Sequence, residues 1–186
     1  MTKFVWLRCL RDHWFQKEKT TSDLHVCCNA SAVAFGAVRY IRMESGKEID
    51  VKFVFAKSRV APIKGFSIPR IKLQAAVWLN RIASILSKEL RLPIRSVRFW
   101  SDSEVGLKWL ALENRRYSSF VLHRVNEVTE ASSADNRSFI SGLDNPADDC
   151  SRGLRPTQLH NHDRWFEGPA FLKEPTENWL QHLDRN

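Results

Sequence analysis

The amino-acid sequence predicts an α/β domain in which helices flank a five-stranded mixed sheet. Three apolar runs follow one another near the start, a long stretch then repeats apolar residues at helical spacing, and shorter strand-like and helical stretches follow. The resulting order is β-β-β-α-β-α-α-β-α, for which a mixed sheet covered by helices is the natural architecture. The 186 residues suit one domain, and a hydrophobic fraction of 43% is ample for its core.

The first three strands are expected at residues 24–29, 34–43 and 51–56, which are rich in Val, Phe and Ile. The stretch "MESGKEID" between the second and third has the glycine and the charges of a hairpin loop. These runs therefore predict an antiparallel meander. Residues 57–70 carry prolines and glycine and are expected to form a connection rather than a strand.

A long helix is expected over residues 71–90, where apolar residues and Asn80 recur at helical spacing. A fourth strand follows at 97–101, and the run Ser101 to Ser103 supplies residue types that cap a helix. Another helix is expected at 120–130 and a short fifth strand at 137–140. A final short helix should begin at Pro146, because proline suits a first helical turn.

We divide the chain into three parts. Residues 1–22 are expected to form an N-terminal helix or extension that docks on the domain, residues 23–155 the domain itself, and residues 156–186 an aromatic tail packed against it. Four tryptophans near the two ends could anchor a protein partner, and they are Trp6, Trp14, Trp165 and Trp179.

The net charge, the cysteines and the hydropathy indicate which partners and which cellular compartment to expect. The formal net charge of +8 and the pI near 9.6 suit polyanion binding, although the basic residues are scattered enough to fit a merely solvated surface. The four cysteines lack zinc-ligand spacing and are expected to be reduced. Without an apolar run near 20 residues or a signal-like start, we expect a cytoplasmic or nuclear protein with no membrane contact and no small-molecule substrate.

Six stretches, in order along nearly the whole chain, carry a family resemblance. They are "CNASAVAFGAV" at 28–38, "AKSRVAP" at 56–62, "IPRIKLQAA" at 68–76, "WSDS" at 100–103, "DNPADDCSRG" at 144–153 and "WFEGPAFL" at 165–172. With these motifs the chain resembles the ribonuclease H domain of BEL/Pao-type LTR retrotransposon polyproteins. The resemblance implies a ribonuclease H-like fold. It also implies an activity, hydrolysis of the RNA strand of an RNA–DNA hybrid by two magnesium ions held by four carboxylates.

Only two of those four carboxylate positions keep their acid here. Carried over one by one, the family's metal-binding positions fall on Asn29, Lys72, Asp102 and Asp148. The family's four acids would carry about −4, whereas Asp102, Asp148 and Lys72 together leave −1. We therefore expect no bound metal, no cofactor and no enzymatic activity, in a degenerate and domesticated copy.

The sequence allows more than one interpretation of the side chains at these four positions. Asp102 could simply cap a helix, and Asp148 could simply favour a first helical turn. Lys72 is hypothesised to lie between both aspartates as a built-in counter-ion. Asn29 alone would also fit an engineered inactive variant, but the charge reversal at Lys72 favours natural loss of function.

Other carboxylates could replace the lost ligands. Glu104, Asp144 and Asp149 are close in sequence to the two retained aspartates. Residues one or two apart on a helix do not face the same way, however, so rescue by these acids is not expected.

Three functions compete. We favour a protein-interaction scaffold that uses the sheet edge or the terminal tryptophans, in a nucleic-acid or RNA-regulatory pathway. The first alternative is a non-cleaving module that binds RNA, DNA or a hybrid. Its candidate contacts are Lys57, Arg59, Arg70, Arg115 and Arg116. The second alternative is a residual metal-dependent ribonuclease H.

Overall fold

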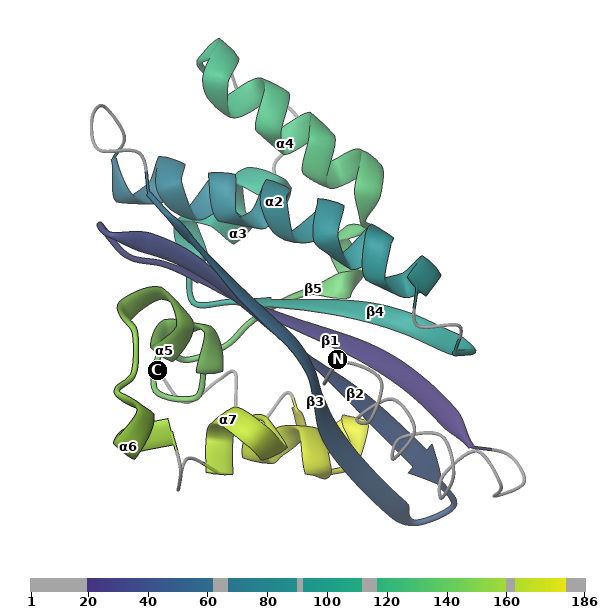
Figure 1. The fold of residues 1–186 in the computed structure, drawn as a ribbon. Coiled ribbons are helices and arrows are strands. Elements are labelled where there is room, and N and C mark those ends of the chain that lie inside the picture. Colours follow the sequence, from purple (N-terminus) through teal and green to yellow (C-terminus); the bar gives the residue numbers. More distant parts are fainter. Residues whose placement is uncertain (1–19, 62–66, 90–91, 112–116, 160–162, 180–186) are drawn as a thin grey trace.

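A computed structural model describes residues 20–61, 67–89, 92–111, 117–159 and 163–179. Within these ranges the chain forms one five-stranded sheet with helices on both of its faces (Figure 1). The helix expected at 3–19, together with Trp6, Trp14, Arg115 and Arg116, lies outside the described residues.

The sheet is mixed, as predicted. The first three strands, β1 (Thr21–Ala30), β2 (Ala34–Ser45) and β3 (Glu48–Val60), form an antiparallel meander. The fourth strand, β4 (Ile94–Ser101), pairs parallel with β1, and the short β5 (Arg137–Phe139) pairs parallel with β4. The spatial order is β3-β2-β1-β4-β5, which places β3 at one edge and β5 at the other. The prediction of a five-stranded mixed sheet flanked by helices is confirmed.

Several sequence-based boundaries are wrong. β2 and β3 extend into the loop expected at 43–50, and α2 begins at Ile68. Residues 57–60 also continue β3, although the prolines and glycine that follow had placed them in the connection. The pairing with β2 extends until Val60 lies opposite Ala34. A strand ladder needs backbone partners and not apolar side chains, so β2 supports the polar end of β3. Lys57 and Arg59 therefore project from an edge strand.

Three helices lie on one side of the sheet: α2 (Ile68–Glu89) and α3 (Glu104–Ala111) lie next to the strands, and α4 (Ser119–Ala131) packs on these two helices. Leu73 and Val77 of α2 pack with Leu110 of α3 and with Val121 and Val125 of α4. These contacts hold the three helices together as one layer. None of the helices in the described part of the chain is long and apolar enough to cross a membrane.

The opposite face is covered by the C-terminal third of the chain (Figure 1). A turn of 3-10 helix at Ala134–Asn136 leads into β5, and α5 (Pro146–Arg152), α6 (Pro156–Leu159) and α7 (Asp163–Glu167) follow. Two 3-10 turns, Ala170–Lys173 and Thr176–Asn178, complete the described chain before Trp179.

The C-terminal segment packs into the same core as the sheet. Phe171, Leu172 and Trp179 belong to one buried cluster with Tyr40 of β2 and Trp100 of β4. Aromatic side chains remove large apolar areas from water, so this cluster contributes a large part of the folding free energy.

A buried arginine fastens the C-terminal segment to β2. The side chain of Arg42 is fully buried and donates from Nε to the Leu172 carbonyl oxygen at 2.9 Å and from Nη2 to the Glu174 carbonyl oxygen at 3.1 Å. A buried cation is tolerated only when its donors are paired, so these two carbonyl groups hold the segment in one position.

Candidate functional site

The four positions singled out in the sequence meet at one end of the sheet. Asn29 lies near the end of β1, and Asp102 directly follows β4, the parallel neighbour of β1. Parallel strands end at the same edge of a sheet, so these two side chains are brought to one place. Lys72 approaches from the start of α2, and Asp148 approaches from the first turn of α5.

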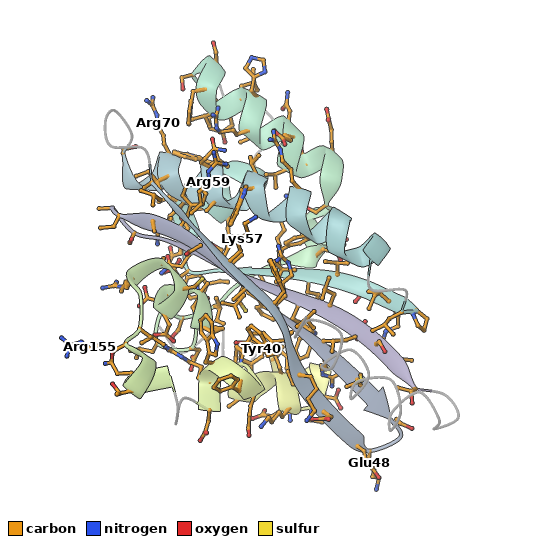
Figure 2. The ribbon with its side chains drawn as sticks, viewed as in Figure 1. Tyr40, Glu48, Lys57, Arg59, Arg70 and Arg155 are labelled. Atoms are coloured by element: carbon orange, nitrogen blue, oxygen red, sulfur yellow. The ribbon has the colours of Figure 1, made fainter. Side chains whose placement is uncertain are left out.

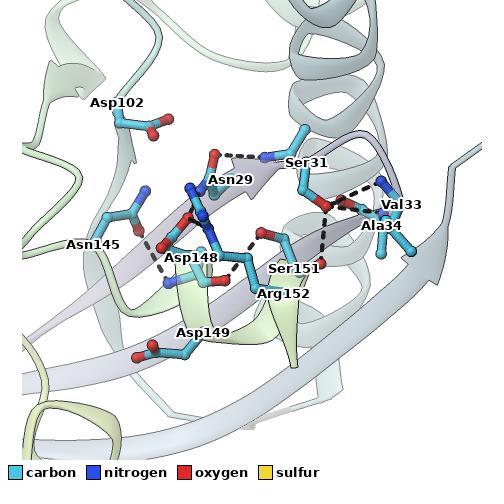
Figure 3. Close-up of polar contacts among 12 residues, drawn as sticks. Asn29, Ser31, Val33, Ala34, Asp102, Asn145, Asp148, Asp149, Ser151 and Arg152 are labelled. Carbon is cyan, nitrogen blue, oxygen red and sulfur yellow. Dashed lines mark hydrogen bonds and ion pairs between the residues drawn. The ribbon is translucent and has the colours of Figure 1, made fainter. Parts of the chain in front are cut away.

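Asn29 forms a hydrogen bond with one of the retained carboxylates (Figure 3). Its Nδ2 donates to Asp148 Oδ1 at 2.6 Å, and its Oδ1 accepts from the Ala30 backbone N–H at 2.7 Å. Asn29 is buried, so both ends of its amide need such partners. The amide thus turns its nitrogen, and not its oxygen, towards the aspartate.

Lys72 neutralises the other retained carboxylate. Its Nζ lies 3.1 Å from Asp102 Oδ1, and the two side chains are only 21% and 15% exposed. A partly buried ion pair of this kind is less screened by solvent than a surface pair. The ammonium group therefore occupies space next to a carboxylate that the family resemblance makes a metal ligand.

The hypothesis that Lys72 bridges both aspartates is wrong for one of them. Asp148 pairs instead with Arg152, whose Nε lies 2.7 Å from Asp148 Oδ1, one helical turn along α5. Among the residues that the structure describes, Lys72 forms an ion pair with Asp102 alone. Each aspartate therefore has its own cation.

Arg152 was missed in the sequence, although its spacing gave a signal. Residues four apart on a helix are neighbours, and Asp148 and Arg152 fall within the helix expected from Pro146. The hydrogen bond to Asp148 raises the pKa of Arg152. Arg152 is 72% exposed, so the pair adds little stability, but its charge brings the group of Asp102, Asp148, Lys72 and Arg152 to neutrality.

Asn145 is a second residue that sequence reasoning missed. It is fully buried and caps α5, because its Oδ1 accepts from the Ala147 backbone N–H at 3.1 Å. Its Nδ2 donates to the Cys28 carbonyl oxygen at 2.8 Å. An asparagine before a proline is a recognisable helix start, but the bond to β1 depends on the fold. Asn145 therefore places Asp148 beside Asn29.

The candidate replacement acids are engaged elsewhere or face solvent. Asp149 pairs with Arg164 of α7, and Glu104 pairs with Lys108 at 3.2 Å on the exposed side of α3. Asp144 is exposed in the turn before α5. Across the described ranges, no group of three or more His, Cys, Asp or Glu side chains is arranged to hold a metal ion.

The sequence was compared with models of protein families. The model described as the Pao retrotransposon-like RNaseH-like domain matches residues 2–103, more than half of the chain. The chain belongs to this family. The match includes Asn29, Lys72 and Asp102, whereas Asp148 lies beyond it.

Solved structures and curated proteins were compared as well. The chain is similar to RNase H1 from the halophilic archaeon Halobacterium salinarum, with 10% identity and a TM-score of 0.44 over 68% of this chain and 90% of that one. It is also similar to LC11-RNase H1 in complex with an RNA/DNA hybrid, with 11% identity and a TM-score of 0.47 over 75% and 99% of the two chains. No curated protein matches the chain.

The residues of this Pao-family domain do not fit the magnesium that the family resemblance implies. Magnesium demands oxygen ligands in near-octahedral geometry. Here Asn29 directs an N–H group at Asp148, and the Lys72 ammonium contacts Asp102. Two of the four positions therefore present hydrogen-bond donors where a hard cation requires oxygen lone pairs.

The predicted nucleic-acid contacts lie on β3 and α2 of the Pao-family domain (Figure 2). Lys57 and Arg59 are exposed on β3, and Lys57 Nζ lies 5.9 Å from the centre of the Trp78 ring. The Arg70 guanidinium lies 5.6 Å from the Phe120 ring centre on α4. Arg70 and Lys57 thus each lie near an aromatic ring, and Lys57 and Arg59 form no ion pair with any described residue.

The described tryptophans do not form a surface patch. Trp179 is only 4% exposed and lies between the guanidinium groups of Arg42 and Arg98, each 5.3 Å from its ring. Trp165 is half-buried and packs against Phe53. The expectation that Trp179 anchors a partner is therefore corrected, because its ring belongs to the core of the domain itself.

Proposed function

We propose that this Pao-family domain does not cleave nucleic acid and acts by binding, as a protein-interaction scaffold in the cytoplasm or nucleus. The observation that carries the proposal is the ion pair between Lys72 Nζ and Asp102 Oδ1, inside the cluster where the family resemblance implies metal ligands. The bond from Asn29 Nδ2 to Asp148 supports it independently.

The ion pair opposes metal binding through electrostatic repulsion. A monovalent and a divalent cation about 5 Å apart repel by roughly 7 kcal/mol at an effective dielectric constant of about 20. To admit a magnesium ion, Lys72 would have to leave Asp102 or lose its proton. Since Asp102 and Asp148 each have a cation already, the cluster gains no relief of charge repulsion from metal binding.

A second candidate function is non-cleaving binding of RNA, DNA or a hybrid. It is favoured by the exposed Lys57 and Arg59, which form no ion pair within the described ranges. Salt dependence separates the two candidates. Affinity for phosphates should fall linearly in log Kd against log salt, whereas docking of a protein through apolar and backbone contacts should respond far less.

The test of lost catalysis is calorimetric titration of magnesium and of manganese into the purified chain, with cleavage of an RNA–DNA hybrid assayed in parallel. The double variant Asn29→Asp, Lys72→Glu restores four carboxylates. The double variant Asn29→Ala, Lys72→Met is its matched control, because it removes the amide and the ammonium without adding ligands.

We expect no metal binding by the natural chain or by the control variant, and metal binding by the variant with four carboxylates. Metal binding and hybrid cleavage by the natural chain would overturn the proposal and would mean that residual ribonuclease H activity survives. If the control variant also binds metal, Asp102 and Asp148 suffice as ligands, and the natural side chains of Asn29 and Lys72 exclude the ion.

A further inference from the structure

The edge strand β3 indicates what kind of partner the domain could bind. β3 is a long strand that pairs with β2 along its whole length, and in the described part of the chain no strand pairs with its other side. The opposite edge strand, β5, has only three residues. An unpaired edge of this length presents a row of backbone donors and acceptors to which another strand can add.

The hydrogen-bond pattern shows which residues face outwards. The Ala61 backbone N–H donates to the Val33 carbonyl oxygen at 2.7 Å, continuing the register in which Val60 lies opposite Ala34. Hydrogen-bonded pairs alternate along an antiparallel ladder. Lys57 and Arg59 therefore turn their backbone groups towards β2, while Ser58 and Val60 turn theirs to the free edge.

Apolar side chains lie exposed at the end of this edge. Val60 is 73% exposed, and Val33, in the loop before β2, is 72% exposed. The hydrogen bond from the Ala61 N–H to the Val33 carbonyl oxygen holds the loop backbone beside the end of β3. A partner that covers Val60 would remove apolar area from water, which phosphate groups cannot do.

Charge indicates the composition of the partner. Between Val51 and Val60 the strand carries three cations and no acid, and among the described residues only Lys52 of these three has an acidic partner, Asp50. Lys57 lies opposite Ala37 and Arg59 opposite Phe35, so both project to the face on which α2 lies. Val60 projects to the other face. A strand laid beside this part of β3 would meet Lys57 and Arg59 on one face of the sheet, and Ser58 and Val60 on the other.

We propose that the free edge of β3 binds an extended acidic segment of a partner protein by strand addition, with Asp or Glu opposite Lys57 and Arg59 and an apolar residue against Val60. This inference rests on the scaffold role proposed above and names its surface and partner class. The exposed valines and the free backbone groups of Ser58 and Val60 favour a peptide over a nucleic acid.

The test measures fluorescence anisotropy of a labelled peptide of about eight residues, a usual strand length, with the full chain. The peptide alternates valine and glutamate. Two further probes are a peptide alternating valine and lysine, and the glutamate peptide N-methylated at alternate residues, which lacks half of its backbone donors. A single-stranded RNA oligonucleotide serves as a competing polyanion.

Two protein variants locate the surface. Ser58→Pro removes the outward N–H without touching the bonds to β2, and Ser58→Ala is its control. Lys57→Glu with Arg59→Glu reverses the charge. We expect Ser58→Pro to weaken binding of the glutamate peptide about tenfold, N-methylation to weaken it at least as much, and charge reversal to transfer preference to the lysine peptide.

Each other outcome overturns the inference. Glutamate-peptide binding that survives both Ser58→Pro and N-methylation would exclude strand addition. RNA binding that is lost on charge reversal but unchanged by Ser58→Pro would identify a phosphate surface. If the glutamate peptide does not bind and the natural chain binds no magnesium, strand addition at β3 is wrong but the proposed loss of catalysis is still supported. Magnesium binding by the natural chain would contradict only the proposed loss of catalysis.

Discussion

Asn29 differs from an aspartate by one group, an amide nitrogen in place of a carboxylate oxygen. With an aspartate at this position, two like charges would face each other where Nδ2 now donates to Asp148 Oδ1 at 2.6 Å. Without metal ions, such a pair would be destabilising. The amide replaces this repulsion with a hydrogen bond. The change that removes a metal ligand therefore also stabilises the metal-free domain.

A buried histidine makes the stability of the domain sensitive to acid. His25 on β1 has no exposed surface, and its Nδ1 accepts from Trp100 Nε1 at 3.0 Å. Burial lowers its pKa to about 3, and the charges of Arg42 and Arg98 act in the same direction. The folded protein therefore keeps His25 neutral, while the unfolded chain protonates it near pH 6.5.

The stability that neutral His25 contributes is complete above pH 6.5 and is lost progressively as the pH falls towards 3. Between pH 7 and pH 5 we expect the free energy of unfolding to fall by about 2 kcal/mol through this group. Urea denaturation at the two pH values measures the change. His25→Gln is the control, since it keeps an acceptor for Trp100 but does not titrate. An equal pH dependence in both proteins would contradict the prediction.

The C-terminal segment is an element of the fold, because its side chains fill the face of the sheet that α2, α3 and α4 leave uncovered. Trp179 contacts Trp100 and Phe171 edge-on, with ring centres 5.6 and 6.0 Å apart. Such aromatic pairs stabilise beyond their buried area. Residues far from the sheet in sequence thus decide whether its second face is covered.

We therefore expect Trp179→Ala to destabilise the domain by about 3–5 kcal/mol, because it leaves a large cavity and removes the ring between Arg42 and Arg98. Phe166→Ala is the matched control, since Phe166 is 42% exposed, and it should cost less than about 1 kcal/mol. Chemical denaturation of the two variants gives the comparison. Similar small losses would show that the segment contributes little.

At the scale of the whole molecule, one buried cluster joins strands β1 to β4 to α5 and the C-terminal segment. It includes Cys27 of β1, Val51 of β3, Trp100 of β4, Ala147 of α5 and Leu172 of the C-terminal segment. On the other face of the same strands, Phe35 packs with Ile71 and Ala75 of α2, so the sheet is shared by the cores on both faces. The domain should therefore behave as a single cooperative body.

We predict one two-state transition in which tryptophan fluorescence and far-ultraviolet circular dichroism change at the same urea concentration. Trp100 and Trp179, which contact each other in the core, contribute to the fluorescence, and circular dichroism reports on the sheet and helices. A fluorescence change that precedes the loss of secondary structure would mean that the C-terminal segment detaches from a domain that stays folded.

Much of the fold could be predicted from local patterns. Apolar runs and helical spacing located all five strands and the helices α2 and α4, because periodicity reflects which side of an element is buried. Capping residues and Pro146 indicated α3 and α5, whereas α6 and α7 were not predicted. The end of β3 was misplaced, since Lys57 and Arg59 look like loop residues until β2 is seen beside them. Arg152 could have been found from its spacing to Asp148, whereas the burial of Trp179 could not.

The sequence by itself determined the order of the elements, the net charge and the residue types at the four altered positions. Only the tertiary structure decided that Lys72 neutralises Asp102, that Arg152 neutralises Asp148, and that β3 is an edge strand of the described sheet. The reason is distance along the chain: Asn29 and Asp148 are 119 residues apart. No local pattern encodes such a contact, which arises only when α5 packs against β1.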